Sequence, residues 1–560
     1  MLKILTSPLR RLASILDHIS DSIAGKEDKP SRVTASSSDM ATIEGITGQQ
    51  FVKGTQAWEN NRYQYATSSH GIDHDMNPQI VIQPRNKEDI KTALKYAKEQ
   101  GIAVAIRTGG HQYSGASSTG GKNIQLDLQR TFRSPDDLKV LPFKDGKAFV
   151  YTSVSHSISE LNTFLGSNSL FVPHGQCSHV HVGGHVQTGG YGQLGRSFGL
   201  FGDHVRSLTL INADSLEIEV TRSSDPDLFY ALLGGSPGNF GVITHIVLEV
   251  HQDKNYSGAM GLRALFLYNK STVERLISYV AEIGDNPDYP RNYDLCVSVL
   301  SSSFPLRALW PGLDSEIKEE HPGIYGEDNI LGWPRSIIVY AQWVPFSDED
   351  REKGPDPEFF ERLQRGNPIK IFQDGVVKKP MSELTKMWLF EDVREFDLPY
   401  EKRTYLTSST SLVEDKWPEW VTGRIDELVA PIDNFCWLSC QIQAFGGKNS
   451  KFTTNADNGT SYSWRDSTVC ATLDAFHWSD HKDTALEWQA KNDSEGIGEK
   501  GKFSKQDRRV LWGSYGEFEM GRVWETYFED REKYQRLGKV RSRMDPYGTF
   551  TPNGFCVKKA

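Results

Sequence analysis

The sequence predicts an α+β fold that is divided into two larger domains. Its 560 residues exceed what one hydrophobic core usually holds, and 38% of them are hydrophobic, which is ample material for a core. A strand–helix–strand pattern fills residues 79–106, whereas longer alternating segments, separated by helical or irregular stretches, follow residue 256. This change in pattern places the main domain boundary near residue 256.

Charge and composition exclude several classes of protein. The formal net charge is −10 and the basic residues are scattered, so the chain lacks the positive surface that binds nucleic acids or anionic membranes. No run of about 18 apolar residues is present, so we expect no membrane-spanning helix. The N-terminus lacks the pattern of a secretory signal, which favours a cytoplasmic location. We expect a monomer or homodimer that acts on a small molecule.

The first half of the chain reads as a series of short elements. Residues 1–46 predict an amphipathic helix and then a Ser-rich flexible linker. Strand, helix and strand follow at 79–83, 87–100 and 104–106, and Gly101 ends the helix. Further strands are expected at 123–128, 148–152, 207–211 and 241–250, with a short helix capped by Asp225. The last strand ends just before the proposed boundary.

The second half predicts a larger sheet and a C-terminal segment. Strands with alternating side chains are expected at 260–267, 294–301, 336–343 and 471–478, within a second domain that spans residues 256–508. Residues 509–560 contain a strand near 511–519 and one helix at 522–537. We expect the second domain to carry the substrate surface.

Two glycine-rich stretches carry the chemical signal. The first, RTGGHQYSGASS at 107–118, follows directly on a strand, where α/β proteins often bind phosphate groups. Its paired glycines allow close approach of a ligand, its hydroxyl side chains add donors, and His111 lies among them. Taken alone, the stretch is also compatible with a structural histidine.

The second stretch is GQCSHVHVGGHVQTGGYG at 175–192. It differs from a dinucleotide-binding fingerprint because no helical pattern follows it. Alternation places His179, His181 and His185 on one side of an extended chain, but no carboxylate is adjacent and no CxxC pair exists, so we expect no metal. Cys177 by itself is compatible with a buried core thiol.

Together with GGSPGNFGVIT at 234–244, these stretches resemble one family in their order and mutual spacing. The chain is similar to the berberine bridge enzyme-like oxidases of the vanillyl-alcohol-oxidase superfamily, over residues 75–255 and again near the C-terminus. The resemblance implies an FAD-binding domain of the PCMH type with two subdomains at 47–255, followed by an α+β substrate domain with an antiparallel sheet. Residues 509–560 would return to the FAD domain.

The resemblance also implies how FAD is held. His111 would bond to the 8α-methyl group of the flavin and Cys177 to ring carbon 6, so the cofactor would be attached covalently twice. His185 matches a histidine near the pyrimidine end, and Val180 matches a position where valine accompanies reactivity with oxygen. The other expected cofactor-binding residues are Arg107, Thr108, Gly109, Gly110, Gln112, Tyr113, Ser117, Ser118, Gly175, Val182, Gly183, Gly184, Gly189, Gly190, Gly192, Gly241, Val242 and Asn553.

The catalytic base is expected in the C-terminal segment. LWGSYGEFE at 511–519 resembles a strand that supplies an active-site tyrosine, so Tyr515 is the expected base, with Glu517 as the alternative base or as its partner. Tyr515 as an ordinary core aromatic stays open. Trp437, Phe445 and Trp464 are expected to contact substrate, which suits either sugars or aromatic scaffolds.

The resulting hypothesis is an FAD-dependent oxidase. It would transfer hydride from an alcohol, a hemiacetal or a natural product to the flavin, and O2 would restore the flavin and yield H2O2. Secondary-metabolite biosynthesis is the preferred context. A carbohydrate oxidase, a flavin dehydrogenase that does not use O2, and a non-redox cyclase on the same fold are the alternatives.

Overall fold

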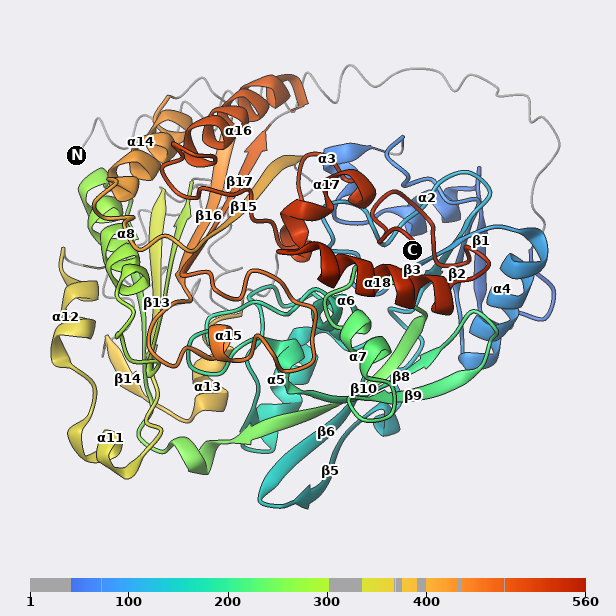
Figure 1. The fold of residues 1–560 in the computed structure, drawn as a ribbon, viewed down its shortest axis with the longest axis horizontal. Helices are drawn as coiled ribbons and strands as arrows, with labels where there is room; N and C mark the ends of the chain where they lie inside the picture. Colours follow the sequence, from blue (N-terminus) through green and yellow to red (C-terminus); the bar gives the residue numbers. More distant parts are fainter. Residues whose placement is uncertain are drawn as a thin grey trace, which may run out of the picture.

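The predicted α+β class is confirmed by a computed structural model (Figure 1). The structure describes residues 42–71, 73–301, 335–366, 368, 375–389, 399–431, 436–477 and 479–560. Residues 1–41, which contain the expected helix and most of the expected linker, lie outside the described residues. Trp478 lies outside them as well. The described residues form three sheets, and the cavity discussed below lies among them. None of the helices in this part of the chain is long and apolar enough to cross a membrane.

A four-stranded sheet opens the chain. Its order is β1 (Gln49–Val52), β2 (Ile80–Gln83), β4 (Ile124–Asp127) and β3 (Val104–Arg107), with the last three parallel. The connecting helix α4 (Lys87–Gln100) begins where the Asn86 side chain accepts a hydrogen bond from the Asp89 N–H, and it ends at Gly101 in the left-handed conformation. The strand–helix–strand prediction is therefore confirmed, and β3 runs directly into the His111 loop.

A six-stranded sheet follows. The strands are β5 (Leu138–Lys144), β6 (Lys147–Ser153), β10 (Val242–Gln252), β8 (Val205–Ile211) and β9 (Glu217–Thr221) in that order, with β7 (Leu170–Phe171) paired to β10. The helices that belong here are α5 (Ile158–Ser167), α6 (Val182–Gln187) and α7 (Pro226–Leu232). Asp225 caps α7 as expected, because its side chain accepts a bond from the Leu228 N–H.

The third sheet is antiparallel throughout and comes wholly from residues after 256. Its order is β14 (Val376–Lys378), β11 (Met260–Leu267), β13 (Ser336–Trp343), β12 (Tyr293–Leu300), β16 (Cys436–Ala444), β17 (Val469–His477) and β15 (Tyr400–Thr407). Helices α8 (Lys270–Asp285), α14 (Trp417–Val429) and α16 (Lys482–Gly496) cover one face of it (Figure 1). The other face points toward the cavity.

The remaining described helices before the C-terminal segment are short. They are α2 (Gln56–Arg62), α3 (Thr67–His70), α11 (Asp348–Lys353), α12 (Pro357–Gln364), α13 (Met381–Lys386), α15 (Lys451–Thr454) and the 3₁₀ turns η1 (Pro135–Asp137), η2 (Phe201–His204), η3 (Asp253–Tyr256), η7 (Ser479–His481) and η8 (Leu511–Gly513). The expected domain boundary at 256 falls between β10 and β11.

The C-terminal segment departs from the sequence prediction. The single helix expected at 522–537 is wrong: α17 (Met520–Tyr527) and α18 (Arg531–Met544) replace it, because Asp530 caps a new helix by accepting from the Lys533 N–H at 2.6 Å. The segment nevertheless lies against the first sheet. The Val104 N–H donates to the Thr549 carbonyl at 2.7 Å, and Leu537, Phe550 and Val557 are buried in the same core as that sheet.

Candidate active site

A cavity of about 270 Å³ lies between the first two sheets and the face of the third sheet that carries no helices. One wall comes from the loop after β3, from residues 175–191 and from residues 237–243, and we call it the cofactor wall. The opposite wall comes from β15, β16 and β17, and we call it the sheet wall. Tyr65 and Trp512 also line the cavity.

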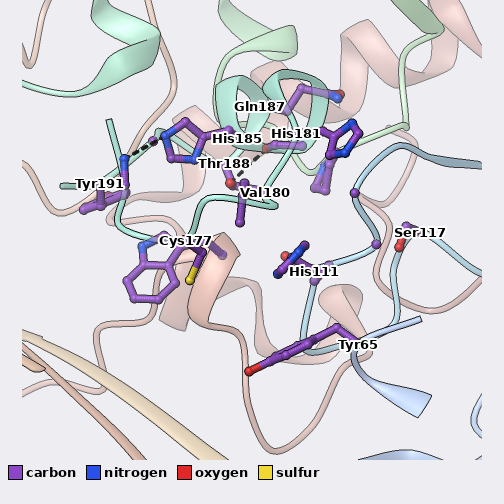
Figure 2. Close-up of a pocket in the computed structure, with 18 of the residues that line it drawn as sticks. Tyr65, His111, Ser117, Cys177, Val180, His181, His185, Gln187, Thr188 and Tyr191 are labelled. Atoms are coloured by element: carbon purple, nitrogen blue, oxygen red, sulfur yellow. Dashed lines mark hydrogen bonds between the residues drawn. The ribbon is translucent and has the colours of Figure 1, made fainter. Parts of the chain in front are cut away.

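His111 reaches the cavity from the loop that follows β3. A Cβ on Gly109 would lie 2.9 Å from the His181 backbone nitrogen, so only glycine allows the two glycine-rich stretches to pack this closely. Gly110 adopts φ +68°, which turns the chain before His111. The Tyr65 ring stacks on the His111 imidazole with centroids 5.2 Å apart (Figure 2).

Cys177 faces the same cavity from the second stretch. In Figure 2 its thiol and the His111 ring lie on either side of Val180. The side chain is partly exposed, whereas the five other cysteines are buried. Just before it, the Gln176 Oε1 accepts a hydrogen bond of 2.6 Å from Gln441 on β16. The cofactor wall is thereby tied to the sheet wall beside Cys177.

The extended conformation expected around His185 is wrong. Residues Val182–Gln187 form α6, and His181 precedes its first turn. A short helix is possible here because Gly183 packs closely: a Cβ on it would lie 2.9 Å from the Val154 Cβ. The alternating arrangement of the three histidines is lost, and the described residues contain no cluster of His, Cys, Asp and Glu that could hold a metal.

His185 is neutral in this site. Its Nε2 accepts a hydrogen bond of 3.0 Å from the Gly175 N–H, which leaves the ring proton on Nδ1. Burial, together with a smaller contribution from nearby His174, lowers the pKa of His185 to about 3. The imidazole therefore acts as a fixed dipole and carries no charge at neutral pH.

The glycines of the cofactor wall have two different uses. Gly175 packs against protein, because a Cβ on it would lie 2.8 Å from the His185 ring. Gly184, in contrast, has no atom within 4 Å of its Cβ position, and it lines the cavity. A side chain on Gly184 would project into open space, so this surface of α6 fits a flat group such as a cofactor ring.

The sheet wall carries a largely buried ion pair. The Lys402 ammonium on β15 donates to both carboxylate oxygens of Asp474 on β17, at 2.8 and 2.9 Å. The two residues are direct partners in the β15–β17 register. Burial raises the pKa of Asp474, and Lys402 opposes part of that rise. The carboxylate is therefore a stronger base than a free aspartate, and it lines the cavity.

Most of the expected cofactor residues line the cavity. Those that do are Thr108, Gly109, Gly110, His111, Gln112, Ser117, Gly175, Cys177, Val180, Gly183, Gly184, His185, Gly190 and Gly241. The structure places Arg107, Tyr113, Ser118, Val182, Gly189, Gly192, Val242 and Asn553 outside the lining. Arg107, for example, points away and pairs with buried Asp127 at 2.7 Å.

Asn553 lies behind the His111 loop. Its side-chain amide donates to the carbonyl oxygens of Ser118, at 2.7 Å, and Ala116, at 3.1 Å. Ala116 lines the cavity and Ser118 does not. Asn553 therefore supports the loop from the C-terminal segment.

The structure places Tyr515 away from the cavity. The strand expected at 511–519 is wrong: η8 and an irregular segment replace it, and Gly516 adopts φ +68°. The Tyr515 hydroxyl donates to Asp507 at 2.8 Å, and the ring lies beside Arg509. Burial and the Asp507 carboxylate raise the pKa of Tyr515 well above its usual value. Glu517 is exposed at the surface and does not line the cavity.

The three expected substrate residues are separated. Phe445 lines the cavity. Trp437 lies on β16, two residues before the lining residue Ser439, and is buried in the core of the third sheet. Trp464 donates from its indole to the Thr526 carbonyl at 2.9 Å and does not reach the cavity.

Several lining residues were not predicted from the sequence. They are Tyr65, Gln176, Gln187, Thr188, Pro237, Gly238, Tyr400, Lys402, Gln441, Gln443, Thr472, Asp474, Phe476 and Trp512. A signal for some of them exists: in CQIQA (440–444) and CATLDAF (470–476), polar residues occupy alternate positions within otherwise apolar strands. Such a pattern indicates a strand with one face on the core and the other on a polar cavity.

Known proteins resemble this chain in sequence. The model of the FAD binding domain family matches residues 78–221. Berberine bridge enzyme-like 18 of Arabidopsis thaliana is 32% identical over 397 residues, which cover 63% of this chain and 70% of that protein. Glucooligosaccharide oxidase of Sarocladium strictum is 30% identical over 230 residues, which cover 38% and 44% of the two chains.

Solved structures share the fold. Glucooligosaccharide oxidase from Acremonium strictum, described with a 6-S-cysteinyl, 8α-N1-histidyl FAD, superposes with a TM-score of 0.65. It is 16% identical, and the superposition covers 92% of this chain and 97% of that one.

Proposed function

Because the chain belongs to the berberine bridge enzyme-like family of FAD-linked oxidoreductases, we propose that it is an oxidase with FAD bound covalently at both His111 and Cys177. One observation carries the proposal: an imidazole and a partly exposed thiol, from two separate glycine-rich stretches, face one cavity. Two nucleophilic side chains that face the same cavity can each form a bond to one flavin ring.

The cofactor wall fits FAD in its chemistry. Gly184 keeps the surface of α6 flat, and neutral His185 offers a ring N–H without adding charge. Thr108, Ser117 and Thr188 add hydroxyl groups on the same wall. When bound, FAD supplies a hydride acceptor that O2 can restore with formation of H2O2.

Asp474 is the base that we propose in place of Tyr515. It is supported by three features: it lines the cavity, burial raises its pKa, and Lys402 keeps its carboxylate oriented at 2.8 and 2.9 Å. Asp474 would accept the proton of a substrate hydroxyl while the carbon-bound hydrogen leaves as hydride. Lys402 would stabilise the ionised carboxylate before proton transfer. The ion pair would be lost once the Asp474 carboxyl is protonated.

The sheet wall favours an alcohol substrate with an apolar or aromatic body. Tyr400 and Phe476 on this wall, and Trp512 of η8 beside Lys402, line the cavity with aromatic rings. A natural-product alcohol is thus the first candidate. A sugar hemiacetal is the second, because Gln441, Gln443 and Thr472 on the same wall could bind hydroxyl groups, and a named relative oxidises glucooligosaccharides.

Val180 is the position that we propose controls access of O2. Its side chain is small, partly exposed and placed between His111 and Cys177 in the cavity view (Figure 2). Replacement with leucine would add bulk there and slow reoxidation by O2, while reduction by substrate stays unchanged. Stopped-flow measurement of the two half-reactions separates them.

The central experiment is mass spectrometry of the peptides that contain His111 and Cys177. Both peptides should carry the flavin mass, and His111→Ala or Cys177→Ala should each retain one bond. Wild-type protein without covalent flavin would refute the proposal. Steady H2O2 production under air separates an oxidase from a dehydrogenase, and anaerobic bleaching of the flavin by substrate excludes a non-redox cyclase.

The cytoplasmic location and the monomeric or dimeric state stay predictions. Cell fractionation tests the first, and light scattering of the purified holoenzyme tests the second.

A further inference from the structure

Tyr65 covers one face of His111 inside the cavity. The two rings are nearly parallel, at an angle of 22°, with centroids 5.2 Å apart. Figure 2 shows the tyrosine ring alongside the imidazole, on the side away from Val180. A parallel ring at this distance restricts rotation of the imidazole about its side-chain bonds.

Tyr65 is itself held from two sides. Its backbone N–H donates to the Gly110 carbonyl at 3.1 Å, which joins it to the residue just before His111. Its ring lies 5.3 Å from the Tyr400 ring on β15, at an angle of 58°. Tyr400 is 1% exposed, so this neighbour is a rigid part of the third sheet.

The aromatic contacts return to the His111 loop. Tyr113, two residues after His111, has its ring 5.0 Å from Tyr400 and donates its hydroxyl to the Tyr400 carbonyl at 3.1 Å. The ring contacts therefore run from His111 through Tyr65 and Tyr400 to Tyr113, and we call these four rings the aromatic clamp. The clamp joins the cofactor wall to the sheet wall, in addition to the Gln176–Gln441 bond.

A fixed imidazole matters when a bond must form. The proposed bond joins a ring nitrogen of His111 to the 8α carbon of FAD, each partner loses one proton, and the two electrons released pass with those protons to O2 as H2O2. The ring nitrogen has to point along one direction for this to occur. A stacked ring pair changes the population of one orientation by about two- to tenfold.

We propose that Tyr65 is the positioning residue for attachment of FAD to His111. The inference rests on the proposed function, because it requires a histidyl bond in the wild type. Tyr65 would act while the histidyl bond forms. This role differs from that of a residue that only contacts the substrate. A substrate wall would change KM and leave the extent of attachment intact.

The test uses variants in which a single covalent bond is possible. In the Cys177→Ala protein, only the histidyl bond can form; in the His111→Ala protein, only the cysteinyl bond can form. Tyr65→Leu and Tyr65→Phe are introduced into each, and Tyr63→Leu, at an exposed neighbouring residue, is the matched control. Intact mass spectrometry at set times after induction gives the fraction of protein that carries flavin.

With Cys177→Ala, we expect Tyr65→Leu to slow histidyl attachment by about three- to tenfold, whereas Tyr65→Phe and Tyr63→Leu keep the rate of the parent. With His111→Ala, Tyr65→Leu should leave cysteinyl attachment unchanged. Unchanged histidyl attachment in Tyr65→Leu would overturn the inference, and loss of both bonds would assign Tyr65 to folding and overturn it as well. A wild type without histidyl flavin would instead refute the proposed function.

Discussion

The two walls of the cavity are built by different physical means. The cofactor wall uses backbone and small residues: glycines that pack closely, a six-residue helix and a neutral histidine. The sheet wall uses long side chains that project from alternate positions of three strands and includes the largely buried Lys402–Asp474 pair. Changes to the first should therefore alter how much flavin is bound, and changes to the second should alter turnover of protein that is fully loaded.

The largest effect is expected from Asp474→Asn. Loss of the base should lower kcat by about 10²- to 10⁴-fold, because general-base assistance contributes about that much. The flavin content, read from the absorbance ratio at visible and ultraviolet wavelengths, should match that of wild type. A fall in kcat of less than tenfold would remove Asp474 from the proposed mechanism.

Gly184→Val is the corresponding test of the cofactor wall. A side chain projecting into the cavity should reduce flavin loading by about 5- to 100-fold, since overpacking a filled site costs about 1–3 kcal/mol. Gly166→Val is the matched control, because Gly166 is also helical, has open space at its Cβ position and does not line the cavity. Equal flavin loading in the two variants would show that α6 does not contact the cofactor.

Lys402→Met sharpens the comparison through the pH dependence of catalysis. Lys402 lowers the pKa of Asp474 against the effect of burial, so its removal raises that pKa further. Because the base must be deprotonated, activity is lost as pH falls through its pKa, and the acid limb of kcat/KM should move to higher pH by about 1–3 units. The acid limb should be absent in Asp474→Asn. If the acid limb of Lys402→Met stays at the wild-type pH, Lys402 does not set the pKa of the base.

Tyr515→Phe should have the smallest effect. The hydroxyl bonds Asp507 outside the cavity, so kcat/KM should change less than about twofold, whereas the free energy of unfolding should fall by about 1 kcal/mol for one lost hydrogen bond. Thermal unfolding and steady-state kinetics measure the two quantities. A large drop in kcat together with loss of the acid limb would restore Tyr515 as the base.

The sequence predicted the two walls unequally for a physical reason. His111, Cys177 and their glycines lie in two contiguous stretches, because a flat binding surface made from backbone requires consecutive residues. Lys402 and Asp474 are 72 residues apart, and only the strand register makes them neighbours. No local pattern contains that pairing.

The error at Tyr515 has a local cause. Residues 511–519 show alternation compatible with a strand, but Gly516 adopts a left-handed conformation and Arg509 bonds the Tyr515 carbonyl at 2.6 Å, so the segment turns away. The contacts that decide its path come from Asp507 and Arg509, which the alternation does not include. The periodicity of a nine-residue segment was too weak to outweigh them.

The alternation of side chains along the strands of the sheet wall has a consequence for how this protein can change over generations or in the laboratory. On β17, Thr472 and Asp474 face the cavity while Ala471, Leu473 and Ala475 pack into the core of the third sheet. Mutations that select a new substrate can therefore accumulate at every second position while the core that sustains folding is left untouched. Residues that determine specificity and residues that determine stability lie on opposite faces of the same strand, so each set can change independently of the other.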